Sequence, residues 1–176
     1  MTPYALGPMS VELDDAKVVE EQTVIQSIRV ETQMIKSQVS FTAPAHILVV
    51  DDHEDSRDVA RMVLEHAGYE VSVAETGTEA FQLAVTAQPD LVLMDIVLPE
   101  IDGLEVSRRL RNHAVTRDMR IVAVTAVARG GIRDEALLAG CNAFLPKPYH
   151  VATLRTLVFE QLLLGRLRAR ARALPI

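Results

Sequence analysis

The sequence has few of the features that disulfide-linked, zinc-binding and membrane-spanning proteins require. One of its 176 residues is cysteine, Cys141, so neither an internal disulfide nor a zinc site of clustered cysteines can form. Aromatic residues make up 4% of the chain, and tryptophan is missing. No apolar run reaches the roughly 18 residues of a membrane span, and the N-terminus lacks the pattern of a signal peptide. We therefore expect a cytoplasmic protein without membrane insertion.

Acidic and basic side chains are unevenly distributed along the chain. The net charge of −6 divides into −3 for residues 1–43, −6 for residues 44–159 and +3 for residues 160–176. Because DNA affinity comes mostly from Lys and Arg neutralising phosphates, the acidic central part argues against a nucleic-acid partner. The basic part is a tail, residues 166–176, with four alternating arginines. It is expected to be a solvated extension of the last helix or a weak tether to an acidic surface.

From about residue 44 the sequence alternates short apolar runs with stretches of helical period. The runs are rich in Val, Ile and Leu throughout, which is typical of strands covered on both faces. Five such runs occupy residues 46–50, 70–74, 91–94, 120–124 and 143–145. The sequence therefore predicts an α/β domain over residues 44–165, a doubly wound sheet of five parallel strands with five helices. Ligands of such sheets bind beyond the carboxyl ends of the strands.

Histidines and apolar residues of the first predicted helix give two further expectations. The residues spaced i, i+3, i+4 and i+7 that we predict to face the sheet are Val59, Met62, Val63 and His66. His66 is thus predicted to be a packed core histidine, and Cys141 a small buried residue before the fifth strand. His53 stands beside an acidic pair, where it either touches the rim of a site or is incidental.

Charged and hydroxyl residues follow four of the five predicted strands. Asp51 and Asp52 follow the first strand, Asp95 the third, Thr125 ends the fourth, and Lys147 follows the fifth. Carboxylates that converge on one edge would repel one another unless a positive charge lies among them. Mg²⁺ is the natural partner of clustered oxygen ligands, and Lys147 supplies a fixed charge. Each residue alone has an ordinary explanation, such as helix capping, but their coincidence at one edge favours a functional site.

These residues occur in motifs that resemble those of response-regulator receiver domains, the CheY-like family. The motifs are LVVDD at 48–52, MDI at 94–96 with LP at 98–99 and DG at 102–103, VTA at 124–126 and FLPKP at 144–148. They stand in order, each at the end of a predicted strand, and the resemblance covers residues 46 to about 164. It implies a flavodoxin-like sheet with strand order 2-1-3-4-5.

The resemblance implies a phosphoacceptor and a metal site. Asp95 matches the phosphoacceptor, whose carboxylate attacks a phosphoryl group delivered from a phosphohistidine and becomes an acyl phosphate. Asp52 and Asp95 would ligate Mg²⁺ directly, together with the backbone carbonyl of Val97. Asp51 would act mainly through metal-bound water.

The remaining matched residues would bind the phosphoryl group and report its presence. The resemblance implies that Lys147, the Thr125 hydroxyl and the Ala126 N–H bind phosphoryl oxygens, and that a cis peptide before Pro148 aims the lysine. Thr125 and Phe144 would form the switch. Because Phe144 has no hydroxyl, packing must carry the signal; the alternative is that it is a plain core aromatic.

About a dozen residues follow the predicted receiver, too few for a DNA-binding or enzymatic output domain. We therefore expect a stand-alone or phosphorelay receiver that accepts a phosphoryl group on Asp95 from a sensor histidine kinase or a histidine phosphotransfer protein. It would catalyse only its own phosphorylation and dephosphorylation and switch contacts with a downstream target protein. One alternative is a phosphorylation-independent binding module. Another, a hydrolase of the haloacid-dehalogenase type, is disfavoured because that family places its nucleophile after strand 1.

Residues 1–43 lie outside the receiver pattern. Apolar residues that fit a heptad are Val18, Ile25, Ile28, Ile35 and Val39, but Glu21 and Thr32 interrupt it. Two interpretations stay open. The segment is either a helical arm that docks or forms a homodimer, or a disordered extension.

Overall fold

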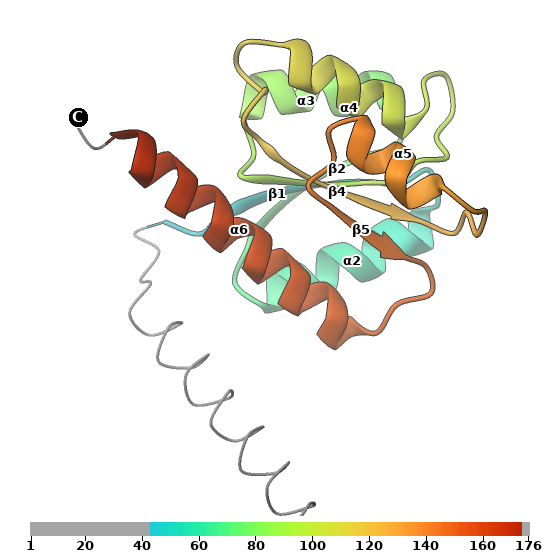
Figure 1. The fold of residues 1–176 in the computed structure, drawn as a ribbon. Helices are drawn as coiled ribbons and strands as arrows, with labels where there is room; N and C mark the ends of the chain where they lie inside the picture. The colour runs from blue at the N-terminus through green and yellow to red at the C-terminus, as the bar shows by residue number, and fades with distance from the viewer. Residues whose placement is uncertain (1–42, 174–176) are drawn as a thin grey trace, which may run out of the picture. The chain divides into compact units, whose positions relative to one another are not determined.

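The computed structural model describes residues 43–173, in which strands and helices alternate (Figure 1). The strands are β1 (His46–Val50), β2 (Glu70–Ala74), β3 (Leu91–Met94), β4 (Arg120–Thr125) and β5 (Ala143–Pro146). The helices are α2 (Glu54–His66), α3 (Gly77–Ala87), α4 (Gly103–Asn112), α5 (Ile132–Leu138) and α6 (Val151–Ala173). The interpretations of the N-terminal extension fall outside the described residues.

The five strands form one parallel sheet in the order β2-β1-β3-β4-β5, which confirms the predicted flavodoxin-like fold. The register of β1 and β3 sets the position of the acidic residues. Val50 is paired with Met94, so Asp51 and Asp95 leave the sheet at the same level. The Asp95 N–H donates to the Val50 carbonyl at 2.9 Å, which continues the ladder to the end of both strands.

Helices cover both faces of the sheet. Figure 1 shows α2 and α6 on one side and α3, α4 and α5 on the other. All four residues of β3 are buried, as are five of the six in β4. Strands covered on both sides must be apolar throughout, because neither face meets water. This explains the unbroken apolar runs of the sequence.

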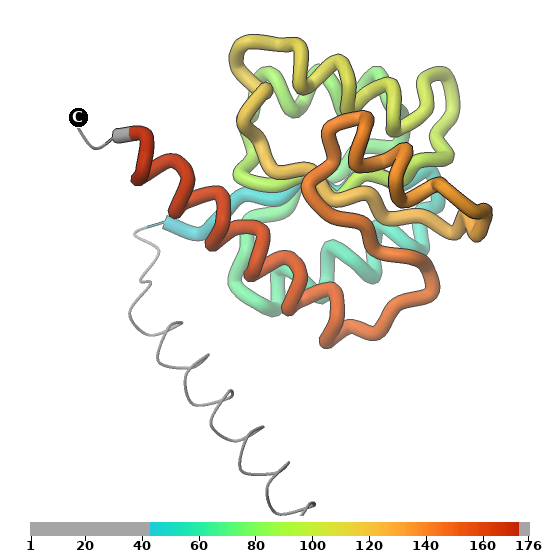
Figure 2. Tube along the Cα trace, in the orientation of Figure 1, coloured from blue at the N-terminus to red at the C-terminus, as the bar shows by residue number. Residues whose placement is uncertain are grey.

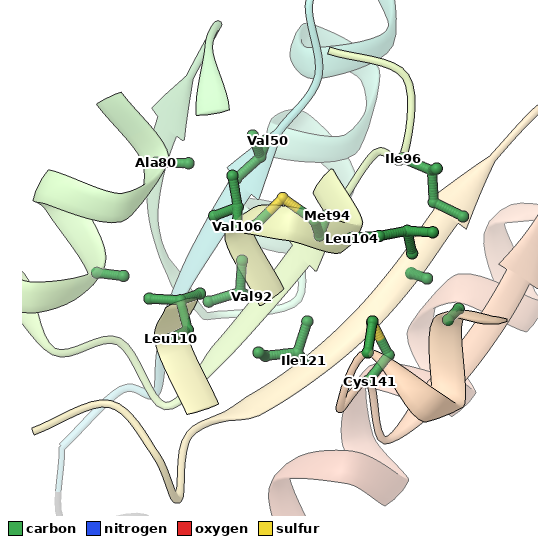
Figure 3. Packing of buried hydrophobic residues seen from close by; sticks show 14 of the residues in the cluster. Val50, Ala80, Val92, Met94, Ile96, Leu104, Val106, Leu110, Ile121 and Cys141 are labelled. Carbon is green, nitrogen blue, oxygen red and sulfur yellow. The ribbon is translucent and has the colours of Figure 1, made fainter. Parts of the chain in front are cut away.

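The main core cluster lies between the sheet and helices α3 and α4. In Figure 3, Val92 and Met94 of β3 and Ile121 of β4 pack with Val106 and Leu110 of α4. These five side chains are at most 1% exposed. Cys141 belongs to the same cluster, and its burial before β5 confirms the prediction. The cluster also includes Met94, the last residue of β3, which directly precedes Asp95.

The face of α2 that packs against the sheet is not the predicted one. Val59 and Met62 are 55% and 69% exposed, and His66 is exposed as well, so the core-histidine prediction is wrong. The buried residues of the helix are Arg57, Ala60 and Leu64. Arg57 is not among the residues of the predicted face. The side chain of Arg57 is buried, and the buried face of α2 is displaced by two positions from the predicted one.

Helix α6 extends well beyond the sheet. Its 23 residues span about 35 Å, whereas a five-residue strand spans about 17 Å. The arginines predicted as a tail therefore continue the helix as far as Ala173, and Figure 2 shows these turns running past the strands. Arg172 Nη1 lies 2.5 Å from Asp118 Oδ2 in the loop before β4. Within residues 43–173 no helix combines the length and hydropathy needed to cross a bilayer.

Candidate functional site

A cleft of about 400 Å³ opens where the carboxyl ends of the strands meet. It is lined by Asp52, His53, Ser56, Asp95, Val97, Thr125, Ala126, Val127 and Lys147. Six of the eight predicted site residues therefore line this cleft. Asp51 lies against this group through its contact with Lys147. Phe144 is the exception, since it packs against the core cluster instead.

The ammonium group of Lys147 holds two carboxylates together. Its Nζ lies 2.5 Å from Asp51 Oδ2 and 2.6 Å from Asp95 Oδ2. The side chains of Asp51, Asp95 and Lys147 are 7%, 8% and 17% exposed. Burial alone would lower the pKa of Lys147, but the hydrogen bonds and charges of the two carboxylates outweigh it and raise that pKa. The lysine therefore stays charged and offsets the repulsion between the two acids.

The carboxylate of Asp95 is held in one orientation. Its Oδ2 accepts from Lys147, and its Oδ1 accepts from the Val97 N–H at 3.0 Å. The backbone of Asp95 is held just as closely, because the first residue of α4 is Gly103. A Cβ atom at this glycine would lie 1.9 Å from the Asp95 carbonyl oxygen. Only glycine permits this approach, which fixes the loop after β3.

Asp51 and Asp52 differ in surroundings although they are neighbours in sequence. Asp51 is buried, and its Oδ1 accepts from the His53 N–H at 3.1 Å. The side chain of Asp52 is 34% exposed, and its Oδ1 lies 2.7 Å from His53 Nδ1. One donor atom from each of Asp51, Asp52 and His53 lies within 4.8 Å of the others, a spacing that can hold a metal ion. His53 therefore belongs to the rim of the cleft.

Thr125 joins β4 to the loop that follows β5. Its hydroxyl oxygen accepts from the Val127 N–H at 3.2 Å, and its carbonyl accepts from the Lys147 N–H at 2.8 Å. The residue is 1% exposed, whereas Ala126 is exposed. The peptide bond between Lys147 and Pro148 is cis, as the resemblance implied. Together these contacts hold the hydroxyl and the ammonium on the same wall.

Phe144 lies in β5 opposite Ala123 of β4. It is partly buried and packs against the core cluster, so its contacts in this structure are those of a core aromatic. It shares the β4–β5 pair with Thr125, which lies two residues further along β4.

Arg57 lies beside the site although its sequence position did not predict this. This residue is 7% exposed, its Nη1 donates to the Asp51 carbonyl at 2.8 Å and its Nη2 to Glu75 Oε1 at 2.6 Å. The guanidinium thus ties the end of β1 to the end of β2. The spacing from Arg57 to Ala60 and Leu64 places all three residues on one face of the helix, and this spacing could have predicted that Arg57 is buried.

Comparisons with known proteins point to one family. The family model described as the response regulator receiver domain matches residues 47–159. The polar-differentiation response regulator DivK of Brucella anthropi is 39% identical over 108 residues, which cover 61% of this chain and 88% of that protein.

Solved structures show the same fold. A CheY-like response regulator receiver domain protein from Methanospirillum hungatei matches with a TM-score of 0.68 and 28% identity, over 72% of this chain and 99% of that one. The receiver domain of the sensor histidine kinase PA1611 from Pseudomonas aeruginosa matches with a TM-score of 0.64 and 33% identity, over 68% and 98% of the two chains. That structure has a magnesium ion coordinated in its active-site cleft.

Proposed function

The chain belongs to the response regulator receiver family, and on this premise we propose that Asp95 accepts a phosphoryl group from a phosphohistidine. A sensor histidine kinase or a histidine phosphotransfer protein would supply the group. The observation that carries the proposal is the position of Lys147, whose ammonium lies 2.6 Å from the Asp95 carboxylate on the wall of a cleft. In this proposal the receiver occupies residues 44–165, and the basic extension follows it.

The transfer makes one bond and breaks one. A carboxylate oxygen of Asp95 bonds to phosphorus while the bond from phosphorus to the donor imidazole breaks, and the imidazole keeps the electron pair. Such transfers need positioning and charge neutralisation more than covalent help. Lys147, which pairs with the carboxylate in this structure, would follow the negative charge onto the phosphoryl oxygens. The Thr125 hydroxyl and the Ala126 N–H would donate to another oxygen.

The donor set suits a hard divalent cation, because it offers carboxylate and carbonyl oxygens. Asp52 and Asp95 with the Val97 carbonyl would hold Mg²⁺, which when bound neutralises charge on the phosphoryl oxygens. The contacts of Asp51 support an indirect role for this residue. One of its oxygens accepts from Lys147 and the other from the His53 N–H, so it would act through metal-bound water.

Phosphorylation would change the packing beside the cleft. A phosphoryl group adds about −1.5 to −2 charge and three strong acceptor oxygens. If Thr125 turns toward these oxygens, Phe144 would fill the space that the hydroxyl leaves, since both lie on the paired strands β4 and β5. The altered surface would then change contacts with a downstream target protein.

Phosphorylation by a small donor tests the assignment. Incubating the full chain with acetyl phosphate and Mg²⁺ should add the mass of one phosphoryl group, measured by intact-protein mass spectrometry. Asp95→Asn should remove the adduct, because the amide is not a nucleophile. Asp58→Asn is the matched control: its side chain is 50% exposed on α2 and pairs with Arg61. An adduct that persists in Asp95→Asn, or that maps to another residue, would overturn the proposal.

A further inference from the structure

His53 brings a nitrogen donor to a cleft in which the proposed metal ligands are all oxygen atoms. Its Nδ1 lies 2.7 Å from Asp52 Oδ1 and 3.8 Å from Asp51 Oδ1. The imidazole is 76% exposed, so no packing forces it into this position. Its orientation is set by the acidic pair, and the ring lines the same cleft as Asp95.

The position of His53 in α2 supports a role for its side chain in the cleft. It is the N-cap residue of the helix, where Ser, Thr, Asp and Asn are preferred because they accept from the first N–H groups. The His53 side chain makes no capping hydrogen bond. Its backbone is extended, and its N–H donates to Asp51. The helix thus begins with a residue whose side chain faces the acidic pair instead of the helix.

The distances fit ligands of a single ion. Donors about 2.1 Å from one ion in octahedral geometry lie roughly 3 Å apart in neighbouring positions and roughly 4 Å apart in opposite ones. His53 Nδ1 and Asp52 Oδ1, which are hydrogen-bonded in this structure, lie 2.7 Å apart, close to the spacing of neighbouring ligands. Small rotations of His53 and Asp52 would let one ion take a donor from each.

The chemistry of the nitrogen donor then separates classes of metal ion. Mg²⁺ takes oxygen ligands and gives up its waters reluctantly, so an imidazole adds little to its binding. Divalent first-row transition ions accept imidazole nitrogen readily, and their affinity rises from Mn²⁺ toward Co²⁺ and Ni²⁺. We propose that His53 is a metal ligand that shifts the selectivity of this cleft from Mg²⁺ toward divalent transition ions. This inference rests on the proposed function, since the ion is that of the phosphorylation site.

Metal binding by variants of the full chain tests the proposal. Titration calorimetry with Mg²⁺ and with Co²⁺ on chelator-treated protein gives the two affinities. His53→Ala should weaken Co²⁺ binding about tenfold or more and change Mg²⁺ binding less than about twofold. The absorption spectrum of bound Co²⁺ should also change, because it depends on the nitrogen ligand. His66→Ala is the matched control, an exposed histidine at the other end of α2 that should alter neither affinity.

The outcomes separate this inference from the proposed function. Equal weakening of Co²⁺ and Mg²⁺ in His53→Ala, or no change in either, would overturn the inference. His53→Gln keeps an N–H donor for Asp52; if it restores Co²⁺ affinity and the spectrum, His53 only orients the carboxylate and the inference is wrong. Phosphorylation of Asp95 by acetyl phosphate and Mg²⁺ in His53→Ala would leave the proposed function intact in each case. Selective Co²⁺ binding without phosphorylation of the wild type would instead overturn the proposed function alone.

Discussion

At the carboxyl edge of the sheet Lys147 faces two carboxylates, whereas at the opposite edge Arg111 faces backbone carbonyl groups. Both side chains are partly buried, and each makes several hydrogen bonds. Burial lowers the pKa of Arg111, whereas the pKa of Lys147 is raised because its partners are charged. The acceptors of Arg111 are Gly140 O at 2.8 Å, Arg117 O at 3.2 Å, Met119 O at 2.6 Å and Asn142 Oδ1 at 2.8 Å.

The partners of the two cations differ in chemistry. This difference separates the edge proposed to bind a phosphoryl group from the edge that only stabilises the fold. Backbone carbonyls cannot change charge, so the contacts of Arg111 hold α4 against the turns before β4 and β5 permanently. The partners of Lys147 are carboxylates, and in the proposed function one of them, Asp95, becomes an acyl phosphate whose new charge the lysine follows. A partly buried cation therefore favours a functional site where its partners are carboxylates and a cleft gives access to them.

The largest effect is expected from Gly103→Ala, at the carboxyl edge. The new Cβ would lie 1.9 Å from the Asp95 carbonyl oxygen, so either α4 or the loop after β3 must move. We expect a loss of about 3 kcal/mol or more in the free energy of unfolding, measured by urea denaturation. Gly130→Ala is the control, since nothing lies within 4 Å of its Cβ position. Similar losses in both variants would show that the close approach at Asp95 is not a constraint.

Arg111→Met tests the opposite edge. It removes the arginine donor of three backbone carbonyls, whereas Asn142 Oδ1 keeps the Ile121 N–H as a donor, and it should cost about 2 kcal/mol of unfolding free energy. Arg108→Met on the same helix, 50% exposed in an ion pair with Glu105, should cost less than about 0.5 kcal/mol. The rate of phosphorylation by acetyl phosphate should be unchanged in the folded Arg111→Met protein. A slower rate would mean that the two edges are coupled and would remove the distinction drawn between them.

The pH dependence of stability provides the smallest and most specific effect. Because the folded-state pKa of Lys147 is raised above the ordinary lysine value of 10.5, its stabilising contribution is complete below that pH. It is lost as the pH rises through the folded-state pKa. Urea denaturation at several pH values above 9 should therefore show a steeper alkaline decline for wild type than for Lys147→Met. Tyr69, whose pKa burial raises, adds a decline common to both proteins. Equal slopes would count against a charged Lys147 between the carboxylates.

The five strands and the place of the cleft could be predicted because both depend on local pattern. A strand covered on both faces must be apolar at every position, and that requirement is visible in β1, β3 and β4 without any structure. The parallel direction of the strands then brings Asp51, Asp95 and Thr125 to one edge. The resemblance to a family added the strand order and the cis bond before Pro148, which composition and periodicity do not contain.

The inner face of α2 could not be predicted by counting apolar residues. Arg57 is buried because the Asp51 carbonyl and Glu75 lie where its guanidinium can reach them, and that arrangement exists only after β1 and β2 have paired. Val59 and Met62 have the right spacing for a core face but point to solvent. An amphipathic pattern gives the period of a helix, but its neighbours decide which side is buried.

The amino-acid order by itself determined the alternation of strands and helices, the edge at which carboxylates, hydroxyl and lysine gather, and the family. The tertiary structure decided how these groups divide their contacts: Lys147 between Asp51 and Asp95, Arg57 under the end of β1, and His53 beside Asp52. The physical reason is that periodicity acts between near neighbours along the chain. Hydrogen bonds and charge pairs depend on distances between side chains that only the folded sheet brings together.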